Sequence, residues 1–141
     1  VLTIKDGDFK GSDSALEIRA GQAIIKDGKF SASATPAKVS SNGNGTTTSG
    51  AAIAVAQHNT KLPVEVTISG GDFTGYHAIS VVNTQNNSAE DCQKVRVYVT
   101  GGTFTATGKM GETPVEMVNV DENFFKVDGD VSKATFSIVA K

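Results

Sequence analysis

The sequence contains no tryptophan and a single cysteine, and its charges nearly cancel. Because Cys92 has no second cysteine to pair with, an internal disulfide and a cysteine-based zinc site are both excluded. The 13 basic and 15 acidic residues give a net charge of −2. This balance argues against nucleic acid as a partner, since phosphate binding requires a basic surface. No apolar run approaches the ~18 to 20 residues of a transmembrane helix, so no membrane span is expected.

Helical periodicity is also missing. No segment combines an apolar stripe at helical spacing with capping residues at its ends. No stretch of residues 1–141 has the pattern of a signal peptide, so none is expected among them. Since the chain opens at Val1 directly inside a repeated pattern, we expect it to be a fragment of a longer chain with further repeats before Val1.

The sequence does contain a recurring stretch, written VEVTISGGDF at Val64–Phe73. Val64, Val66 and Ile68 alternate with polar residues, which is the pattern of a strand with one buried face. The two glycines that follow favour a tight corner, after which Phe73 returns to the interior. Similar stretches are LTIKDGDF at Leu2–Phe9, AIIKDGKF at Ala23–Phe30 and VYVTGGTF at Val97–Phe104.

Equivalent positions of these stretches form columns, and a shorter stretch such as ALEI, AIAV, AISV or PVEM follows each one. The interval from Ile4 to Ile25 is 21 residues, near the shortest repeat that a solenoid uses. One coil of short strands cannot bury its own apolar side, so stacked coils are expected to share a core. The predicted ladders are Ile4, Ile25, Ile68 and Val99; Phe9, Phe30, Phe73 and Phe104; and Leu16, Ile53, Ile79 and Val115.

This repetition predicts an all-β chain that forms a single domain over residues 1–141, with about five coils and loop excursions. The coils are expected at about 1–21, 22–60, 61–94 and 95–120, with a closing turn and last strand at 121–141. The adjacent Phe124 and Phe125 do not fit an alternating strand. We therefore expect an irregular turn there that covers the open core, followed by a strand at Ala134–Val139.

Three polar stretches interrupt the repeats, at Ser33–Gly50, Thr84–Lys94 and Ala106–Thr113. The first two are rich in serine, asparagine or threonine and have too little apolar content for a core. If all three leave from equivalent corners, they gather on one side of the molecule. Insertions that cluster in this way often mark a binding face.

The stretches VTISGGDFTG and VYVTGGTFTA, together with AISV, resemble the right-handed parallel β-helix repeats of large secreted or cell-surface proteins of bacteria. They are also similar to the β-helices of phage fibres and tailspikes. The resemblance covers nearly the whole chain and implies a right-handed parallel β-helix. Proteins of this architecture include polysaccharide lyases, glycoside hydrolases, adhesins and carbohydrate-binding modules, so the fold alone does not select a function.

Enzymes of that architecture carry clustered carboxylates on one outer face. Here Asp8 and Asp72 share an outward column with Lys29 between them, so at ~4.8 Å per strand they would lie about 10 Å apart, too far to share calcium. We therefore predict no catalytic residue, no metal site and no cofactor. Calcium is an alternative at the closing turn, but a solvated acidic turn is favoured. The residues concerned are Asp121, Glu122, Asp128 and Asp130.

Tyr76 and His77 precede the AISV stretch and are the leading candidates for ligand contact. A sugar ring could stack on the tyrosine and accept or donate a hydrogen bond at the imidazole. The alternative is a solvent-facing pair at a corner. Asp72, Asn83 and Asn86 complete the predicted ligand-binding set.

These features favour a non-catalytic module at the cell surface or outside the cell, acting as a structural stalk, an adhesin or a glycan-binding surface. The expected partners are a polysaccharide or a host or cell-surface glycan, and further β-helix coils of the same parent chain. One alternative is part of a polysaccharide lyase or glycoside hydrolase. The other is a phage fibre or capsid-decorating protein on a virion, for which an apolar outward column is expected; Ile24 and Tyr98 are the hints of one.

Overall fold

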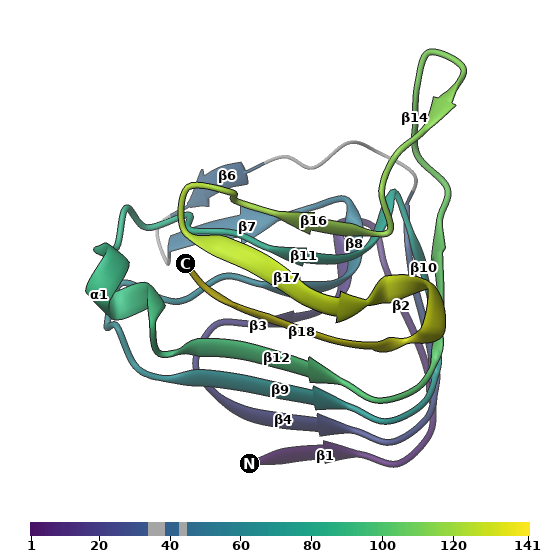
Figure 1. The fold of residues 1–141 in the computed structure, drawn as a ribbon, viewed down its shortest axis with the longest axis horizontal. Helices are drawn as coiled ribbons and strands as arrows, with labels where there is room; N and C mark the ends of the chain where they lie inside the picture. The colour runs from purple at the N-terminus through teal and green to yellow at the C-terminus, as the bar shows by residue number, and fades with distance from the viewer. Residues whose placement is uncertain (34–38, 43–44) are drawn as a thin grey trace.

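The structure, a computed structural model, describes residues 1–33, 39–42 and 45–141. Strands make up 54% of the chain and helices 6%, which confirms the predicted all-β class. Most strands belong to three sheets, here named A, B and C, whose inner faces share one apolar core (Figure 1). The strands of sheet A run side by side in Figure 1 from β1 at the bottom to β12.

Each sheet joins strands that are far apart in the sequence. Sheet A has the order β1 (Leu2–Ile4), β4 (Gly21–Ile25), β9 (Val64–Ile68), β12 (Val95–Val99), β18 (Thr135–Ala140), β17 (Phe125–Asp130). Sheet B has the order β13 (Thr103–Ala106), β10 (Asp72–Gly75), β5 (Lys29–Ala32), β2 (Asp8–Gly11). Sheet C has the order β16 (Val118–Val120), β11 (His77–Val81), β8 (Ala51–Val55), β3 (Ser14–Ile18).

The first four strands of sheet A pair in parallel, as do all strands of sheets B and C. Along the chain, one strand of sheet A is followed by one of sheet B and then one of sheet C. We call each such set a three-strand unit. The four units are β1–β2–β3, β4–β5–β8, β9–β10–β11 and β12–β13–β16.

The register between units places like residues over like residues. In sheet A the column is Ile4, Ile25, Ile68 and Val99, and in sheet B it is Phe9, Phe30, Phe73 and Phe104. Both predicted ladders are therefore confirmed. A buried phenylalanine in such a column contributes on the order of 2 to 3 kcal/mol to stability through the apolar area it removes from water.

The phenylalanine rings of sheet B stack almost parallel to one another. Their centroids are 4.9 Å apart from Phe9 to Phe30, 5.0 Å from Phe30 to Phe73 and 4.9 Å from Phe73 to Phe104. These distances match the ~4.7–4.9 Å spacing of neighbouring strands, so each ring lies directly over the next. Phe30 and Phe73 are fully buried.

A glycine column makes the corner before each phenylalanine possible. Gly71 has φ +111°, a conformation that side chains rarely adopt, and a Cβ there would lie 3.0 Å from the carbonyl oxygen of Gly28 and 3.1 Å from Cζ of Phe73. Glycine is therefore required both for the backbone angle and for the close approach of the neighbouring unit.

The third ladder is correct in three of its four members. Leu16, Ile53 and Ile79 share a column of sheet C, but the next residue in it is Val118, so the prediction of Val115 is wrong. The PVEM stretch does not form the strand. Its Pro114 belongs to β15 (Thr113–Pro114), which pairs with β14 (Lys109–Met110) in a hairpin that moves the sheet C strand three residues along the chain.

The closing segment reverses the chain direction. β18 pairs antiparallel with β12 and with β17, and the 3-10 helix η1 (Val131–Lys133) joins β17 to β18. The expected last strand is confirmed as β18. A turn is present at residues 122–124, but the irregular segment was expected to continue beyond it, and this part is wrong because Phe125 is buried and begins a strand. Phe136 adds an edge-to-face contact, 5.9 Å between centroids, with Phe104.

This antiparallel pair makes sheet A mixed, so the chain is not a single coiled helix. The resemblance to the β-helix repeats of bacterial surface proteins and phage fibres is therefore wrong as a description of this chain. The parallel pairing is confined to the four units, and the sequence repeats describe those units alone. The parallel stack ends after the fourth unit because β17 and β18 turn back along it. Their residues Phe125 and Phe136 join the apolar core there, and Phe136 contacts Phe104.

The polar stretches are more ordered than expected. Within Ser33–Gly50, part of which lies outside the described residues, β6 (Val39–Asn42) pairs with β7 (Gly45–Thr48). Thr84–Lys94 contains the short helix α1 (Ala89–Cys92). The first and third stretches leave from the corner between sheets B and C, whereas the second leaves from the corner between C and A. The expected gathering therefore holds for two of the three.

The phenylalanine column yields a matched test. Phe73→Ala should lower the free energy of unfolding by about 3–5 kcal/mol, because the ring is fully buried between two others. Phe9→Ala should cost less, because Phe9 is half-buried and stacks on one ring alone. Chemical denaturation of both variants measures the difference, and equal losses would contradict the stacked column.

Candidate functional site

A groove of about 650 Å³ lies beside the β14–β15 hairpin. Its walls come from that hairpin, from β16 and the residues just before it, from β17, and from Tyr76 and His77 at the start of β11. Its apolar lining includes Met110, Val115 and Val127. Besides Tyr76, the polar residues that line it are His77, Thr113, Glu116, Asn119, Glu122, Lys126 and Lys141. It therefore brings together residues from position 76 to position 141 of the chain.

Tyr76 supports the wall of this groove. Its side chain is 8% exposed, and its hydroxyl donates a hydrogen bond to the carbonyl oxygen of Lys109 at 3.4 Å. Gly108 lies against the ring, where an added Cβ would come within 2.4 Å of Cδ2. A sugar ring therefore has little access to the aromatic face of Tyr76, on which stacking was expected from the sequence.

His77 is held in one orientation. Its Nδ1 lies 2.6 Å from the carbonyl oxygen of Glu116, and its ring meets Tyr76 edge-on with centroids 5.1 Å apart. Because a carbonyl oxygen only accepts hydrogen bonds, Nδ1 carries the proton, and Nε2 of the neutral ring is an acceptor. The two predicted residues are thus in contact through their rings, with His77 the more exposed member.

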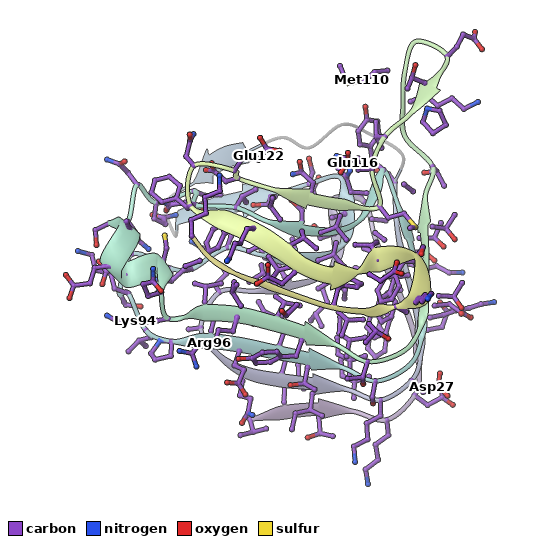
Figure 2. The ribbon with its side chains drawn as sticks, viewed as in Figure 1. Asp27, Lys94, Arg96, Met110, Glu116 and Glu122 are labelled. Carbon is purple, nitrogen blue, oxygen red and sulfur yellow. The ribbon has the colours of Figure 1, made fainter. Side chains whose placement is uncertain are left out.

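Two carboxylates border the groove from the ends of β16. Glu116 precedes the strand and Glu122 follows it, and both side chains are exposed (Figure 2). Lys126 on β17 contributes a positive charge to the same groove. Asn119 lies between them and donates a hydrogen bond to Oγ of the buried Ser80 at 3.0 Å. Sequence reasoning named Glu122 only as part of the acidic closing turn and missed the other three, because the pairing of β16 with β11 places this segment beside His77.

The remaining predicted ligand residues lie elsewhere. Asp72 opens β10 and is exposed in an outward column of sheet B with Asp8, Lys29 and Thr103, the column predicted from the repeats. Asn83 lies just after the C-terminal end of β11, whereas His77 lies at its start. Asn83 Nδ2 donates a hydrogen bond to the carbonyl oxygen of Asn87 at 2.8 Å, and its Oδ1 accepts one from the backbone N–H of Asn87 at 3.0 Å. Asn86 is exposed with φ +53°, which suits an asparagine in a turn.

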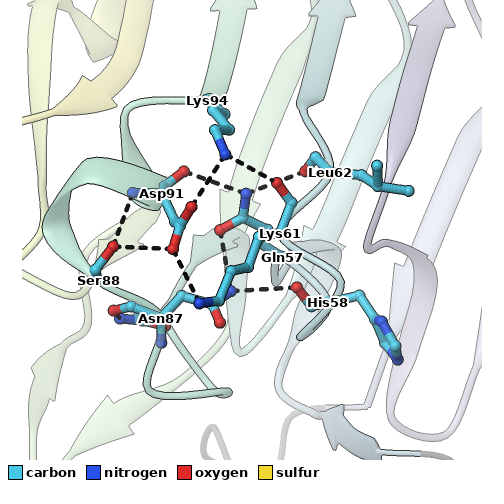
Figure 3. A network of polar contacts seen from close by, with 9 residues as sticks. Gln57, His58, Lys61, Leu62, Asn87, Ser88, Asp91 and Lys94 are labelled. Atoms are coloured by element: carbon cyan, nitrogen blue, oxygen red, sulfur yellow. Dashed lines mark hydrogen bonds and ion pairs between the residues drawn. The ribbon is translucent and has the colours of Figure 1, made fainter.

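A buried polar network fixes the second polar stretch (Figure 3). Gln57 and Asn87 are 3% and 4% exposed, and Asn87 Nδ2 donates to Gln57 Oε1 at 3.0 Å. Gln57 Nε2 donates to the carbonyl oxygens of Leu62 and Asp91 at 3.0 and 3.2 Å. Buried amides are stable only when paired, so this network pins α1 to the turn after β8.

Asp91 is the centre of the charged part of this network. Its carboxylate lies 3.0 Å from Nζ of Lys94 and 3.4 Å from Nζ of Lys61, and it accepts a hydrogen bond from Oγ of Ser88. The hydrogen bonds from Lys94 and Ser88 hold the pKa of Asp91 below its ordinary value.

Two other groups have perturbed acidity. Burial raises the pKa of the Cys92 thiol, with a smaller contribution from the charges of Asp121 and Asp91. Burial also raises the pKa of Glu17, although the backbone N–H of Thr48 donates to its Oε1 at 3.3 Å. A buried thiol with a raised pKa is a poor nucleophile, so Cys92 has the properties of a core residue.

Three acidic side chains of the closing segment make contacts with residues two positions away. Asp130 accepts a hydrogen bond from the backbone N–H of Ser132 at 3.0 Å, and Asp121 accepts one from that of Asn123 at 3.2 Å. Asp128 lies 3.7 Å from Lys126. In the described ranges, no group of three or more histidine, cysteine or acidic residues is placed to hold a metal ion.

No protein-family model, curated protein or solved structure matches the chain. The resemblance to bacterial and phage repeat proteins is thus left without a family match, in addition to the mixed sheet that contradicts it. Among residues 1–33, 39–42 and 45–141, no helix has the length and apolar character of a membrane span.

The contacts of Asp91 predict a pH dependence. Because its pKa is lowered in the folded state, the ionised carboxylate stabilises the fold above the ordinary value near 3.8, and this contribution is lost as the pH falls through the lowered value. Asp91→Asn should therefore lower the melting temperature at neutral pH, and the difference from wild type should shrink in acid. Calorimetry from neutral to acidic pH measures this difference in melting temperature, with Asp8→Asn at an exposed position as the control. A difference that persists in acid would contradict the assignment.

Proposed function

We propose that this protein is a non-catalytic module that acts outside the cell and binds a polysaccharide or cell-surface glycan in the groove beside His77. The observation that carries the proposal is the pairing, in one groove, of polar side chains with an apolar floor. Sugar hydroxyls form hydrogen bonds with groups such as carboxylates, amides and imidazole, while sugar C–H faces pack on apolar side chains. Binding sites for small ligands commonly combine these two features.

His77 supports the proposal through its fixed ring. The 2.6 Å contact between Nδ1 and the carbonyl oxygen of Glu116 orients the imidazole before any ligand arrives. Nε2 of the neutral ring then accepts a hydrogen bond from a hydroxyl donor, and Glu116 and Glu122 supply further acceptors at the same groove. A preoriented group loses little conformational entropy on binding.

Tyr76 has a supporting role in this proposal instead of the stacking role expected from the sequence. Its ring is covered by Gly108 and its hydroxyl is bound to Lys109, so it fixes the base of the hairpin that forms one wall. The exposed Met110, at 76%, and the half-buried Val115 and Val127 provide apolar surface in its place.

We also propose a right-handed winding for the four three-strand units, residues 2–120. About 98% of crossover connections between parallel strands of one sheet are right-handed. Three such connections join β1, β4, β9 and β12. The stack of units is a rigid support on which the groove and its hairpin are displayed.

The proposal is tested by glycan-array binding of the purified chain, together with lyase and hydrolase assays on plant and host polysaccharides. His77→Ala should weaken binding to any array hit by about tenfold or more, because it removes the oriented acceptor. Asp72→Asn is the matched control and should leave binding unchanged, since Asp72 lies in the outward column of sheet B.

Turnover of a polysaccharide would remove the non-catalytic assignment. Absence of any array hit would remove glycan binding. A hit that weakens with Asp72→Asn and not with His77→Ala would move the site from the groove to sheet B.

A further inference from the structure

The two ends of the stack of units are different. In the described part of the chain, β1, β2 and β3 are the terminal strands of sheets A, B and C, and each pairs on one side. At the other end, β18 and β17 extend sheet A in antiparallel fashion, and Phe136 covers the ring of Phe104. At that end sheet A therefore extends two strands beyond β13 and β16, whereas at the other end, here called the open end, the three sheets stop together at the strands of the first unit.

The apolar interior is also uncovered at the open end. Leu2 is 48% exposed, whereas its partner in the next unit, Ala23, is 2% exposed. Phe9 is half-buried over the fully buried Phe30. The same holds in sheet C, where Leu16 is half-buried over the fully buried Ile53. All three sheets thus expose an inward-facing side chain at this end.

We propose that this open face binds one further three-strand unit: a polypeptide segment with the same order of strand, glycine corner and phenylalanine, running parallel to β1, β2 and β3. The basis is continuity with the interface between the units already present. The face of the first unit carries the same elements in the same register, namely a β-branched residue at Ile4, a corner glycine at Gly7 and a ring at Phe9.

Stacking of this kind would pair the backbone groups at the strand edges and cover the exposed apolar side chains. Parallel pairing supplies partners for the free backbone groups of three edges, which are otherwise templates for uncontrolled pairing. A phenylalanine at the ~4.8 Å strand spacing would stack on Phe9 as Phe30 does on its other side. Edge strands that remain free in isolated proteins usually carry charged or proline residues. The edge strand β1 has neither, whereas β2 carries Asp8 and Lys10 and β3 carries Glu17.

A second copy of the chain fits this face less well. Copies cannot stack end to end through all three sheets at once, because β18 and β17 extend sheet A two strands beyond β13 and β16. Two copies related by a twofold axis would bring β1 against its own copy in antiparallel orientation, unlike every pairing between units. The direction of the strands therefore favours a segment that continues the stack.

The test adds such a segment to the full chain. A duplicate of residues 1–21 placed before Val1 keeps the 21-residue interval that separates Ile4 from Ile25. We expect the melting temperature to rise by about 5 °C or more. We also expect amide hydrogen exchange in β1, β2 and β3 to slow by about tenfold or more relative to the unmodified chain.

The matched control carries Ile4→Ser and Phe9→Ser in the added copy alone. It should give neither the rise in melting temperature nor the slower exchange. The proposal is overturned if the unaltered duplicate behaves like this control. It is also overturned if the unmodified chain sediments as a dimer with slow exchange in β1, β2 and β3, since a second copy would then occupy the face. Neither readout depends on a glycan, so the result is independent of the proposed function.

Discussion

The stacking of Phe9, Phe30, Phe73 and Phe104 is the interaction on which the architecture depends. The rings can lie 4.9 to 5.0 Å apart only if every unit enters sheet B at the same residue of its repeat. A slip of one residue would turn each ring toward solvent. The corner glycines permit this entry, so the registers of sheets A and B are set together by one local sequence, a glycine two residues before a phenylalanine.

Much of the fold was predictable because the units repeat a short-range signal. Alternation, corner glycine and phenylalanine recur within ten residues, and they correctly identified the columns of Ile4 and Phe9. The failures occur where the repeat is interrupted. Val115 and Val118 fit an alternating strand equally well, and the choice depends on the β14–β15 hairpin. Phe125 was misread because Phe124, its half-buried neighbour, hides the alternation.

The groove was only partly accessible from sequence. The adjacency of Tyr76 and His77 drew attention to one wall, but the Glu116 and Lys126 walls come from segments that the fold alone brings together. The amides of Gln57 and Asn87 were hidden for a different reason. Asn87 stands in the polar stretch Thr84–Lys94, where a solvated loop is expected, and Gln57 lies just after the AIAV stretch. The burial of both follows from their mutual hydrogen bond, which composition does not reveal.

The corner between sheets B and C has a consequence for how this molecule can vary. The chain crosses it within a few residues from β2 to β3, yet carries whole hairpins there from β5 to β8 and from β13 to β16. Ser14, Ala51 and His77 nevertheless stay in register. Since loop closure becomes costlier only slowly with length, foreign peptides of very different sizes can be grafted at this corner while the scaffold beneath keeps its shape.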